Sequence, residues 1–394
     1  MNVHAPIQSL QLASGPVTVR PVATAADRKA FLDLPYRAYG NLPAWRAPLR
    51  FERAAQIDPR KNPALAQMPH ELLLAWRSGE PVGRIAVFVN PAHLARHNDQ
   101  TGHFGFLDTL QEDEETVAAL MQAAEAWLRQ KGMLRIAGPF NFSVNEECGL
   151  LVDGFDTPPV MMMLHGRPDY APALERIGYS KAMDMFAYMI RMGETFEPPP
   201  IARRLIEGFE RDPRLKIRNL DSRNYENEIN QILDIFDDAW SGNWGFVPFG
   251  KAEITHMAKE LKPLITPDNL WIGLIDDEPA CFALVLPDIF EAADGLNGRL
   301  LPFGWIQFLH RLKIAGTTTA RIPLAGMRRK FHKTRRGVQT MAATCSMTLA
   351  AQHARGVRNI EASWILETNS NLINIISLFD APKYKTYRIY GKPL

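Results

Sequence analysis

The residues with the strongest chemical character lie in one loop near the C-terminus. RRKFHKTRR, residues 328–336, holds six Lys or Arg among nine residues. An apolar run precedes it, Gly337 follows, and apolar residues then recur at helical spacing. A buried strand, a basic turn with Gly and a helix N-terminus together form the arrangement that holds a phosphate, because backbone N–H groups and the positive helix end face the anion. The predicted pyrophosphate contacts are Arg335, Arg336, Gly337, Val338, Gln339 and Thr340.

A run of Lys and Arg is also typical of a solvated face or a nucleic-acid patch. The whole chain carries a formal charge of only +2. A nucleic-acid binder normally shows a wider basic excess with interleaved aromatic residues. We therefore expect no nucleic-acid partner. The choice between an anion site and a solvated face stays open on this stretch alone.

Carboxylates in a predicted strand form a second candidate set. In RNIEASWIL, residues 358–366, and the residues that follow, alternation places Glu361, Ser363, Glu367 and Asn369 on one face. A central strand buried on both sides should be nearly all apolar, so two carboxylates there are unexpected. Glu361 and Glu367 are candidate general bases, and the alternative is structural ion pairing. Asn369 is a candidate site residue as well, or simply the N-cap of the last helix.

Isolated side chains add weaker candidates. His310 is a second possible base, although a lone His on an apolar stripe is more often structural. Cys345 falls on a buried helix face and is predicted to be a small hydrophobe. The three cysteines lie far apart without a C-x-x-C pair, which fits a reducing cytoplasm and predicts no metal site.

The order of predicted elements repeats along the chain. A chain of 394 residues favours two domains. The first half shows a strand at residues 17–22, a helix opened by Thr24, two strands at 70–77 and 79–90, an apolar run at 104–110, a helix at 114–131 and a strand from 134. The second half repeats this order from residue 215, and Gly132–Ile136 aligns without gaps on Gly356–Ile360. We predict two copies of one α/β unit, residues 1–195 and 196–394, with the linker near Pro198–Pro200.

The two copies differ between strand and helix. The first has LDTLQEDEET, which is acidic, lacks Gly and would repel a pyrophosphate. Anion binding is therefore assigned to the C-terminal copy, and the N-terminal copy is placed on the substrate side. The next strand of the first copy is polar without being acidic, which suits recognition of substrate hydroxyl groups. Its candidate substrate contacts are Asn141, Ser143, Asn145 and the following Glu146.

Two aromatic segments could serve an apolar substrate. RLLPFGWIQFLHRLK, which contains Trp305, places its apolar residues on one helical stripe that could lie at a membrane interface, line an acyl channel or pack on the core. WSGNWGFVPF, with Trp240, Asn243 and Trp244, could wall an acyl site or cap a core. No apolar run of about eighteen residues appears, and the N-terminus lacks leader-peptide features. We expect a cytoplasmic protein, or one associated with the inner face of a membrane.

This order of elements resembles the GNAT acyltransferases. Their loop [QR]-x-x-G-x-[GA] binds the pyrophosphate of coenzyme A, and Gly337 stands at its Gly position, with Thr334 at the first position and Gln339 at the last. NIEASWILETNSNLINIISLFDAPKYKTYRIYGK is similar to the family's final strand, helix and closing strands. The tandem layout, with GPFNFSVNEECGLLVDGF and WILETN, resembles the bacterial ceramide synthases. The fold implied is α/β, with two tandem GNAT-like domains, each a mixed twisted sheet flanked by helices.

The resemblance implies N-acyl transfer from a thioester, on coenzyme A or acyl carrier protein, to the amine of a long-chain base, without a metal. An alkyl amine with a pKa of about 10 is protonated at neutral pH, so a base is the main requirement. The oxyanion donor expected in this family lies on the strand before the pyrophosphate helix, at Ala325, Gly326 or Met327. The Tyr often found in the last helix is replaced by Phe379, and Tyr384 lies nearby. An N-acyltransferase for polar amines and a non-catalytic acyl-CoA sensor remain rival interpretations.

Overall fold

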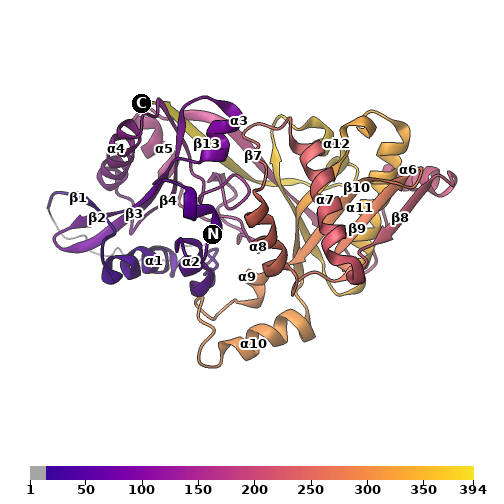
Figure 1. The fold of residues 1–394 in the computed structure, drawn as a ribbon. Helices are drawn as coiled ribbons and strands as arrows, with labels where there is room; N and C mark the ends of the chain where they lie inside the picture. Colours follow the sequence, from indigo (N-terminus) through magenta and orange to yellow (C-terminus); the bar gives the residue numbers. More distant parts are fainter. Residues whose placement is uncertain (1–14) are drawn as a thin grey trace, which may run out of the picture. The chain divides into compact units, whose positions relative to one another are not determined.

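The computed structural model describes residues 15–394, so most of the N-terminal stretch considered for a leader peptide lies outside the described residues. The chain forms two compact units. Unit 1 is the chain up to Asp184 with Ala293–Leu300 and Tyr387–Leu394, and unit 2 is Met185–Ala292 with Leu301–Thr386. Figure 1 shows the elements in chain order.

Unit 1 is built on a mixed sheet. Its strands lie in the order β1 (Thr18–Pro21), β2 (His70–Arg77), β3 (Glu80–Phe88), β4 (Thr101–Thr109), β5 (Arg135–Gly138) and the end of β13 (Lys383–Pro393). All neighbours pair antiparallel except β4 and β5, which are parallel. The remaining elements are α1 (Ala25–Tyr39), α2 (Arg50–Gln56), η1 (Pro63–Gln67), α3 (Pro91–His97), α4 (Glu114–Gln130), β6 (Leu150–Asp153) and α5 (Tyr170–Arg176).

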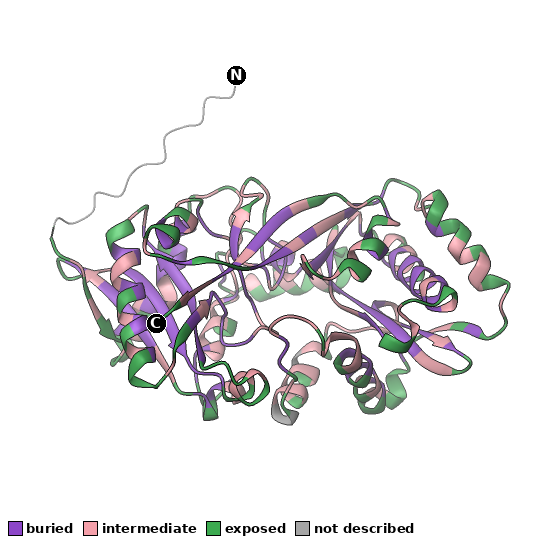
Figure 2. Cartoon of the chain, turned by 90° about the horizontal axis from the view of Figure 1, so that it is seen from above, coloured by how far each residue is buried: buried purple, intermediate pink, exposed green. Residues whose placement is uncertain are grey.

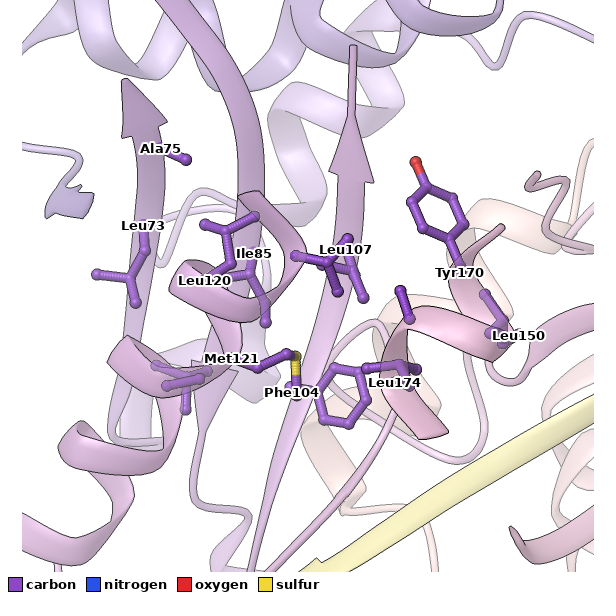
Figure 3. Close-up of a cluster of buried hydrophobic side chains, with 14 of the residues drawn as sticks. Leu73, Ala75, Ile85, Phe104, Leu107, Leu120, Met121, Leu150, Tyr170 and Leu174 are labelled. Atoms are coloured by element: carbon purple, nitrogen blue, oxygen red, sulfur yellow. The ribbon is translucent and has the colours of Figure 1, made fainter. Parts of the chain in front are cut away.

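The core of unit 1 forms where helices α4 and α5 cover strands β2 to β4. Leu73, Ile85 and Phe104 point from the strands toward Leu120 and Met121 of α4 (Figure 3). These side chains alternate along each strand, which is the period that turns one face of a sheet inward. The helix α1 is fixed at its start by a capping box in which Thr24 accepts a hydrogen bond from the backbone N–H of Asp27 (3.0 Å).

Unit 2 repeats the same plan. Its strands lie in the order β8 (Leu215–Asn219), β9 (Leu270–Ile275), β10 (Glu278–Pro287), β11 (Thr319–Met327), β12 (Asn359–Leu366) and β7 (Ser180–Arg191). Again the only parallel pair is the fourth with the fifth, β11 with β12. The helices are α6 (Pro200–Glu210), η2 (Ser222–Asn224), α7 (Tyr225–Trp240), α8 (Lys251–Leu261), η3 (Pro267–Asn269), α9 (Ile289–Ala292), α10 (Gly304–His310), η4 (Arg311–Ala315), η5 (Arg329–Phe331), α11 (Arg335–Ala354) and α12 (Ser370–Ser377). In Figure 2 purple prevails on the strands, and pink and green prevail on most of the helices.

The matching order of pairing confirms the predicted duplication and α/β class. Gly132 and Gly356, the aligned glycines, both have positive φ (+76° and +92°) just before the fifth strand of their unit. Beyond that strand the two units differ in length, because unit 1 has a long segment with β6 before α5. The boundary also differs from 195/196, since β13 contributes its end to unit 1 and β7 contributes to the sheet of unit 2. Each closing strand thus joins the sheet of the other half, which no local sequence signal predicts.

Candidate active site

The parallel strands β11 and β12 of unit 2 separate after a short paired stretch. They pair from Thr319 with Asn359 to Ile322 with Ala362. Beyond this point β11 continues only against β10, and β12 bulges after Ala362 and continues against β7. Within residues 15–394, Pro323–Met327 has no strand partner on its β12 side. The separation leaves backbone groups of β11 facing away from the sheet ladder.

Alternation along β11 decides which of these groups face the open side. The N–H of Arg328 donates to the carbonyl of Ala280 on β10 (2.8 Å). The backbone N–H and C=O groups of the even-numbered residues of β11 therefore face β10. The carbonyls of Ala325 and Met327 instead accept from Trp240 Nε1 (3.2 Å) and contact His332 Nε2 (2.6 Å). In an antiparallel strand the N–H and C=O of one residue point the same way. Ala325 and Met327 therefore fit the predicted oxyanion donors, whereas the N–H of Gly326 is directed at β10.

A buried polar network lies at the point where the two strands part. Glu361 of β12 and Arg321 of β11 stand opposite each other in register, and both are fully buried. Arg321 Nε lies 3.9 Å from Glu361 Oε1 and donates to Ser363 Oγ (3.0 Å), and Nη2 donates to the carbonyl of Ser363 (3.1 Å). The hydroxyls of Ser363 and of half-buried Tyr384 both donate to Glu361. A carboxylate is thus held in the core of unit 2 by a cation and two hydroxyl donors.

Helix α11 follows β11, as predicted. It begins at Arg335, before the residues whose amides were predicted to bind the anion. Thr334 is its N-cap and accepts from the N–H of Gly337 (3.0 Å), and the N–H of Val338 bonds the carbonyl of Thr334 (3.1 Å). The amides of Gly337–Thr340 are therefore used within the helix. Those left for an anion are the N–H groups of Arg335 and Arg336, the first two helical positions.

The side chains of this loop divide into paired and unpaired sets. Four of its six basic residues are neutralised within unit 2: Arg328 by Asp234, Arg329 by Asp238, Lys330 by Glu278 and Arg336 by Asp212. Lys333 and Arg335 are exposed and make no ion pair with any residue of the described chain. An anion at the helix end would meet Lys333 and Arg335 first. Most basic side chains of this loop therefore form ion pairs within unit 2, and only Lys333 and Arg335 are solvated and unpaired among the described residues.

Comparison with known proteins places this arrangement in a family. No protein-family profile matches the chain. The chain is 40% identical to the bacterial ceramide synthase of Caulobacter vibrioides over 387 residues, covering 96% of this chain and 98% of that protein. The chain belongs to the bacterial ceramide synthase family. It is also 38% identical to protein YghO of Escherichia coli over 395 residues, covering both chains completely.

Solved structures give the same fold for this ceramide synthase family member. A tandem GNAT protein from the clavulanic acid biosynthesis pathway matches with a TM-score of 0.56 at 10% identity, covering 96% of this chain and 98% of that one. A GCN5-related N-acetyltransferase from Sphaerobacter thermophilus matches with a TM-score of 0.52 at 12% identity, covering 97% of both chains. The tandem GNAT fold is therefore confirmed, and the chain is an acyltransferase of the GNAT type.

Of the other residues that the sequence placed at or near this strand, Ser363 and Tyr384 hydrogen-bond Glu361. Glu367 lies in the turn after β12, since the strand ends at Leu366 and its bulge breaks the alternation. Asn369 is the N-cap of α12 and accepts from the N–H of Leu372 (3.1 Å). The common face predicted for Glu361, Glu367 and Asn369 is therefore wrong. His310 is exposed on α10 and belongs to a different part of unit 2.

The predicted anion contacts deep in α11 have packing roles. A Cβ on Gly337 would meet the carbonyl oxygen of Phe331 at 2.1 Å, so this glycine is required by its own loop. Gln339 is buried against Gly208 of α6. A Cβ added to Gly208 would lie 2.0 Å from Nε2 of Gln339. Thr340 is fully buried and donates to the carbonyl of Arg336 (2.8 Å). Cys345 is buried, as predicted, and burial raises the pKa of its thiol to about 12.

The polar residues predicted to bind substrate in unit 1 make hydrogen bonds within the unit. Asn141 is buried, accepts from the N–H of Phe106 (2.9 Å) and donates to Glu147 (2.8 Å), which pairs with Arg53. Ser143 accepts from the N–H of Asn145 (3.1 Å), and Glu146 accepts from Gln56 (2.7 Å). These hydrogen bonds indicate a structural role for the four residues, and their predicted contact with substrate stays a prediction. Their polar atoms close a loop of the protein.

The aromatic residues predicted near an acyl chain fall into two environments. Trp240 ends α7 and packs on Phe236 (ring centroids 4.8 Å), which also contacts Phe246 and Phe249. Asn243 and Trp244 are half-buried in the turn that follows. This cluster caps the α7 side of β11, the plainer of the two predicted roles. Trp305 instead lies 45% exposed on α10.

Sequence reasoning missed Arg321 and Trp364. Arg321 interrupts an otherwise apolar strand run opposite the strand of Glu361, and that pair of opposite charges was the available signal. The guanidinium of Arg321 lies over the Trp364 ring (4.5 Å to the centroid). The buried Nε1 of Trp364 has no hydrogen-bond partner among the described residues. An unsatisfied buried donor beside a polar network is a candidate contact for a substrate oxygen.

The His residues of unit 1 include a pair that sequence reasoning passed over. His93 and His97 are four residues apart on α3, with ring centroids 4.5 Å apart, and His93 contacts Asp99 (3.1 Å).

Within residues 15–394, no group of three or more His, Cys, Asp or Glu side chains is arranged to hold a metal ion. In the same residues, no helix combines the length and the apolar character needed to cross a bilayer.

Proposed function

We propose that this enzyme transfers a fatty acyl group from an acyl thioester, acyl-CoA, to the amine of a long-chain sphingoid base, giving a ceramide-type amide. The relative named as a bacterial ceramide synthase supports this assignment at 40% identity over nearly the whole chain. The observation that carries the mechanism is the Tyr384–Glu361–Arg321 network beside the unpaired end of β11.

Proton removal is the task of this network. The substrate ammonium first releases one proton to solvent. The neutral amine then loses a second proton as its nitrogen bonds to the thioester carbon, and the half-buried Tyr384 hydroxyl accepts it. Tyr384 receives that proton on its oxygen while its own proton passes to Glu361, to which it already donates. The thiolate leaves with the electrons of the carbon–sulfur bond and takes up a proton from solvent. Arg321 and Ser363 keep the Glu361 carboxylate in the accepting orientation.

Acyl-donor binding is the task of β11 and α11. The N–H groups of Ala325 and Met327 face the open side of β11, where they can stabilise the thioester oxyanion. The free N–H groups at the start of α11, with Lys333 and Arg335, suit the pyrophosphate of coenzyme A. Acyl transfer from a thioester held between the β11 amides and the start of α11 requires no metal and no covalent acyl-enzyme.

The test is direct detection of amide product. Purified protein is incubated with acyl-CoAs of several lengths and with sphingoid bases, amino acids and polyamines, and products are identified by mass spectrometry. We expect amide only with sphingoid bases, and a loss of about a hundredfold or more in kcat for Tyr384→Phe and for Glu361→Gln. Tyr225→Phe, which removes a hydroxyl bonded only to the carbonyl of Ala258 on the helical side of unit 2, is the matched control.

Each alternative predicts a different result. Amide with polar amines and none with sphingoid bases would replace the substrate assignment. Binding of acyl-CoA without turnover of any amine would leave a sensor rather than an enzyme. Turnover from acyl carrier protein but not from coenzyme A would move the thioester to that partner.

A further inference from the structure

One short segment of unit 2 exposes most of the large apolar side chains at the surface. Ten such side chains are exposed in the described part of the chain, and six of them lie between residues 301 and 314. Leu301, Phe303 and Ile314 are 81%, 74% and 77% exposed. The remaining three are Trp305, Ile306 and Leu309. Single exposed apolar residues are ordinary, but a contiguous group of this kind marks a surface that meets something apolar.

The segment is ordered but is not packed on the core of its unit. It consists of α10 and the π-helical turn η4, which pack on each other and on α9. No residue of α10 is buried. Figure 1 draws α10 well away from the sheet β8–β12 of the same unit. The sequence alternative of a helix packed on the core is therefore wrong, because the apolar stripe faces outward.

The charged side chains within this segment have one sign. Leu301–Ile314 contains Arg311 and Lys313 and no Asp or Glu. Within the segment, Lys313 donates to the carbonyl of Pro263 and Arg311 to that of Ala292 (3.3 Å). These side chains hold positive charge beside the apolar residues. Such a surface complements the phosphates of anionic lipids.

The polar content of the segment favours a bilayer over a protein partner. Protein interfaces carry about one hydrogen bond per 100–200 Å². Between Leu301 and Leu309 only Trp305 and Gln307 have side chains able to hydrogen-bond. Trp and Phe with flanking Lys and Arg are instead typical of helices that lie in the plane of the lipid headgroups.

We propose that Leu301–Ile314 docks this protein on the surface of an anionic lipid bilayer. Leu301, Phe303, Ile306 and Ile314 enter the boundary between headgroups and acyl chains, and Lys313 remains at the level of the phosphates. This surface goes beyond the acyl-transfer proposal and does not depend on it. It would deliver the enzyme to the phase in which long-chain lipids are dissolved.

The test is sedimentation of the full chain with vesicles. One set contains 30% phosphatidylglycerol in phosphatidylcholine and the other only phosphatidylcholine. We expect binding to the anionic vesicles that falls with salt, and a loss of about tenfold or more in the partition coefficient for Phe303→Ser/Ile314→Ser. Lys313→Gln should cost about fivefold. Ile201→Ser on α6, also an exposed isoleucine (63%), is the matched control and should bind as the parent does.

Three outcomes would overturn the proposal. The first is no binding to either vesicle set, and the second is equal binding by the Phe303→Ser/Ile314→Ser variant and the Ile201→Ser control. The third is self-association of the parent, seen by analytical ultracentrifugation and removed by Phe303→Ser/Ile314→Ser, which would make this face an interface between copies of the chain. Because exposed residues are changed and vesicle binding is read without substrate, none of these outcomes bears on the acyl-transfer proposal.

Discussion

The same two strands meet in both units, but different side chains stand where they part. In unit 1 the third residue pair of β4 and β5 is His103 with Ala137, and in unit 2 the equivalent pair of β11 and β12 is Arg321 with Glu361. One position holds a buried neutral imidazole whose Nδ1 has no partner among the described residues. The other holds a buried opposite-charge pair joined to a tyrosine. At this equivalent position of the duplicated fold, only unit 2 places a pair of opposite charges among the described residues.

The two units also differ in the backbone beyond this pair. In unit 1 the separating strands are closed by the chain itself: Phe140 donates its N–H to the carbonyl of Phe104 (2.7 Å), and Asn141 accepts from the N–H of Phe106. A Cβ on Gly105 would meet the Phe140 carbonyl at 1.8 Å, so the strands are in direct contact there. In unit 2 the corresponding β11 backbone has no strand beside it within the described residues. In unit 1 this edge is closed by backbone hydrogen bonds, whereas in unit 2 it meets the side chains of Trp240 and His332.

The largest effect should come from breaking the charge pair of unit 2. Arg321→Met leaves Glu361 as a buried carboxylate without its cation, which should lower the free energy of unfolding by about 3–5 kcal/mol. Urea denaturation measures it. Arg321→Met/Glu361→Gln, which removes both charges, should recover much of that loss. If the double variant were no more stable than the single one, the pair would not be an interacting unit, and the contrast with His103 and Ala137 would lose its meaning.

Unit 1 can be tested for the opposite property by removing its closing amide. Asn141→Ala leaves the Phe106 N–H and Glu147 without this partner, which should cost about 1–3 kcal/mol of unfolding free energy and leave kcat and KM of the folded fraction unchanged. Thermal denaturation and steady-state kinetics separate the two quantities. A raised KM for the amine at unchanged stability would restore the substrate-binding role that the sequence predicted for Asn141.

The His103 position should make unit 1 acid-sensitive. Burial, with His93 close by, lowers the pKa of His103 from 6.5 to about 3. Between these values the unfolded chain binds a proton that the folded chain does not. Stability is therefore complete above pH 6.5 and falls by about 1.4 kcal/mol per pH unit below it, levelling off near pH 3. His103→Gln should remove this slope in urea titrations from about pH 7 to pH 5, and equal slopes in parent and variant would contradict it.

The sequence predicted the elements better than their partners. The bounds of β2 and α4 match the predicted ranges to within one residue, because caps, alternation and helical periodicity are local signals. The exchange of β7 and β13 and the pairing of Arg321 with Glu361 depend on long-range packing that no periodicity records. Of the candidate site, the sequence pointed to Glu361 through strand alternation and to Tyr384 through its proximity to Phe379, and the structure joins the two by a hydrogen bond. Glu367 was misplaced because a β-bulge shifts the alternation, and bulges leave little trace in sequence.

The smallest and most selective effect concerns the start of α11, set against the start of α4. Arg335 is exposed and unpaired within the described chain, whereas Arg336 is held by Asp212. If the anion meets the free N–H groups and the unpaired cation, Arg335→Ala should raise KM for acyl-CoA about fivefold to tenfold and leave kcat unchanged, while Arg336→Ala should change KM by less than about twofold.

The start of α4 is the matched control. There the N-cap Asp113 accepts from the N–H of Thr116 (3.1 Å) and pairs with Arg77, so this helix end carries its own anion. Because acyl-CoA is not expected to bind there, Asp113→Asn should leave KM for acyl-CoA unchanged. Equal effects of Arg335→Ala and Arg336→Ala would indicate general attraction by the basic loop, and a raised KM in Asp113→Asn would place donor binding in unit 1 as well.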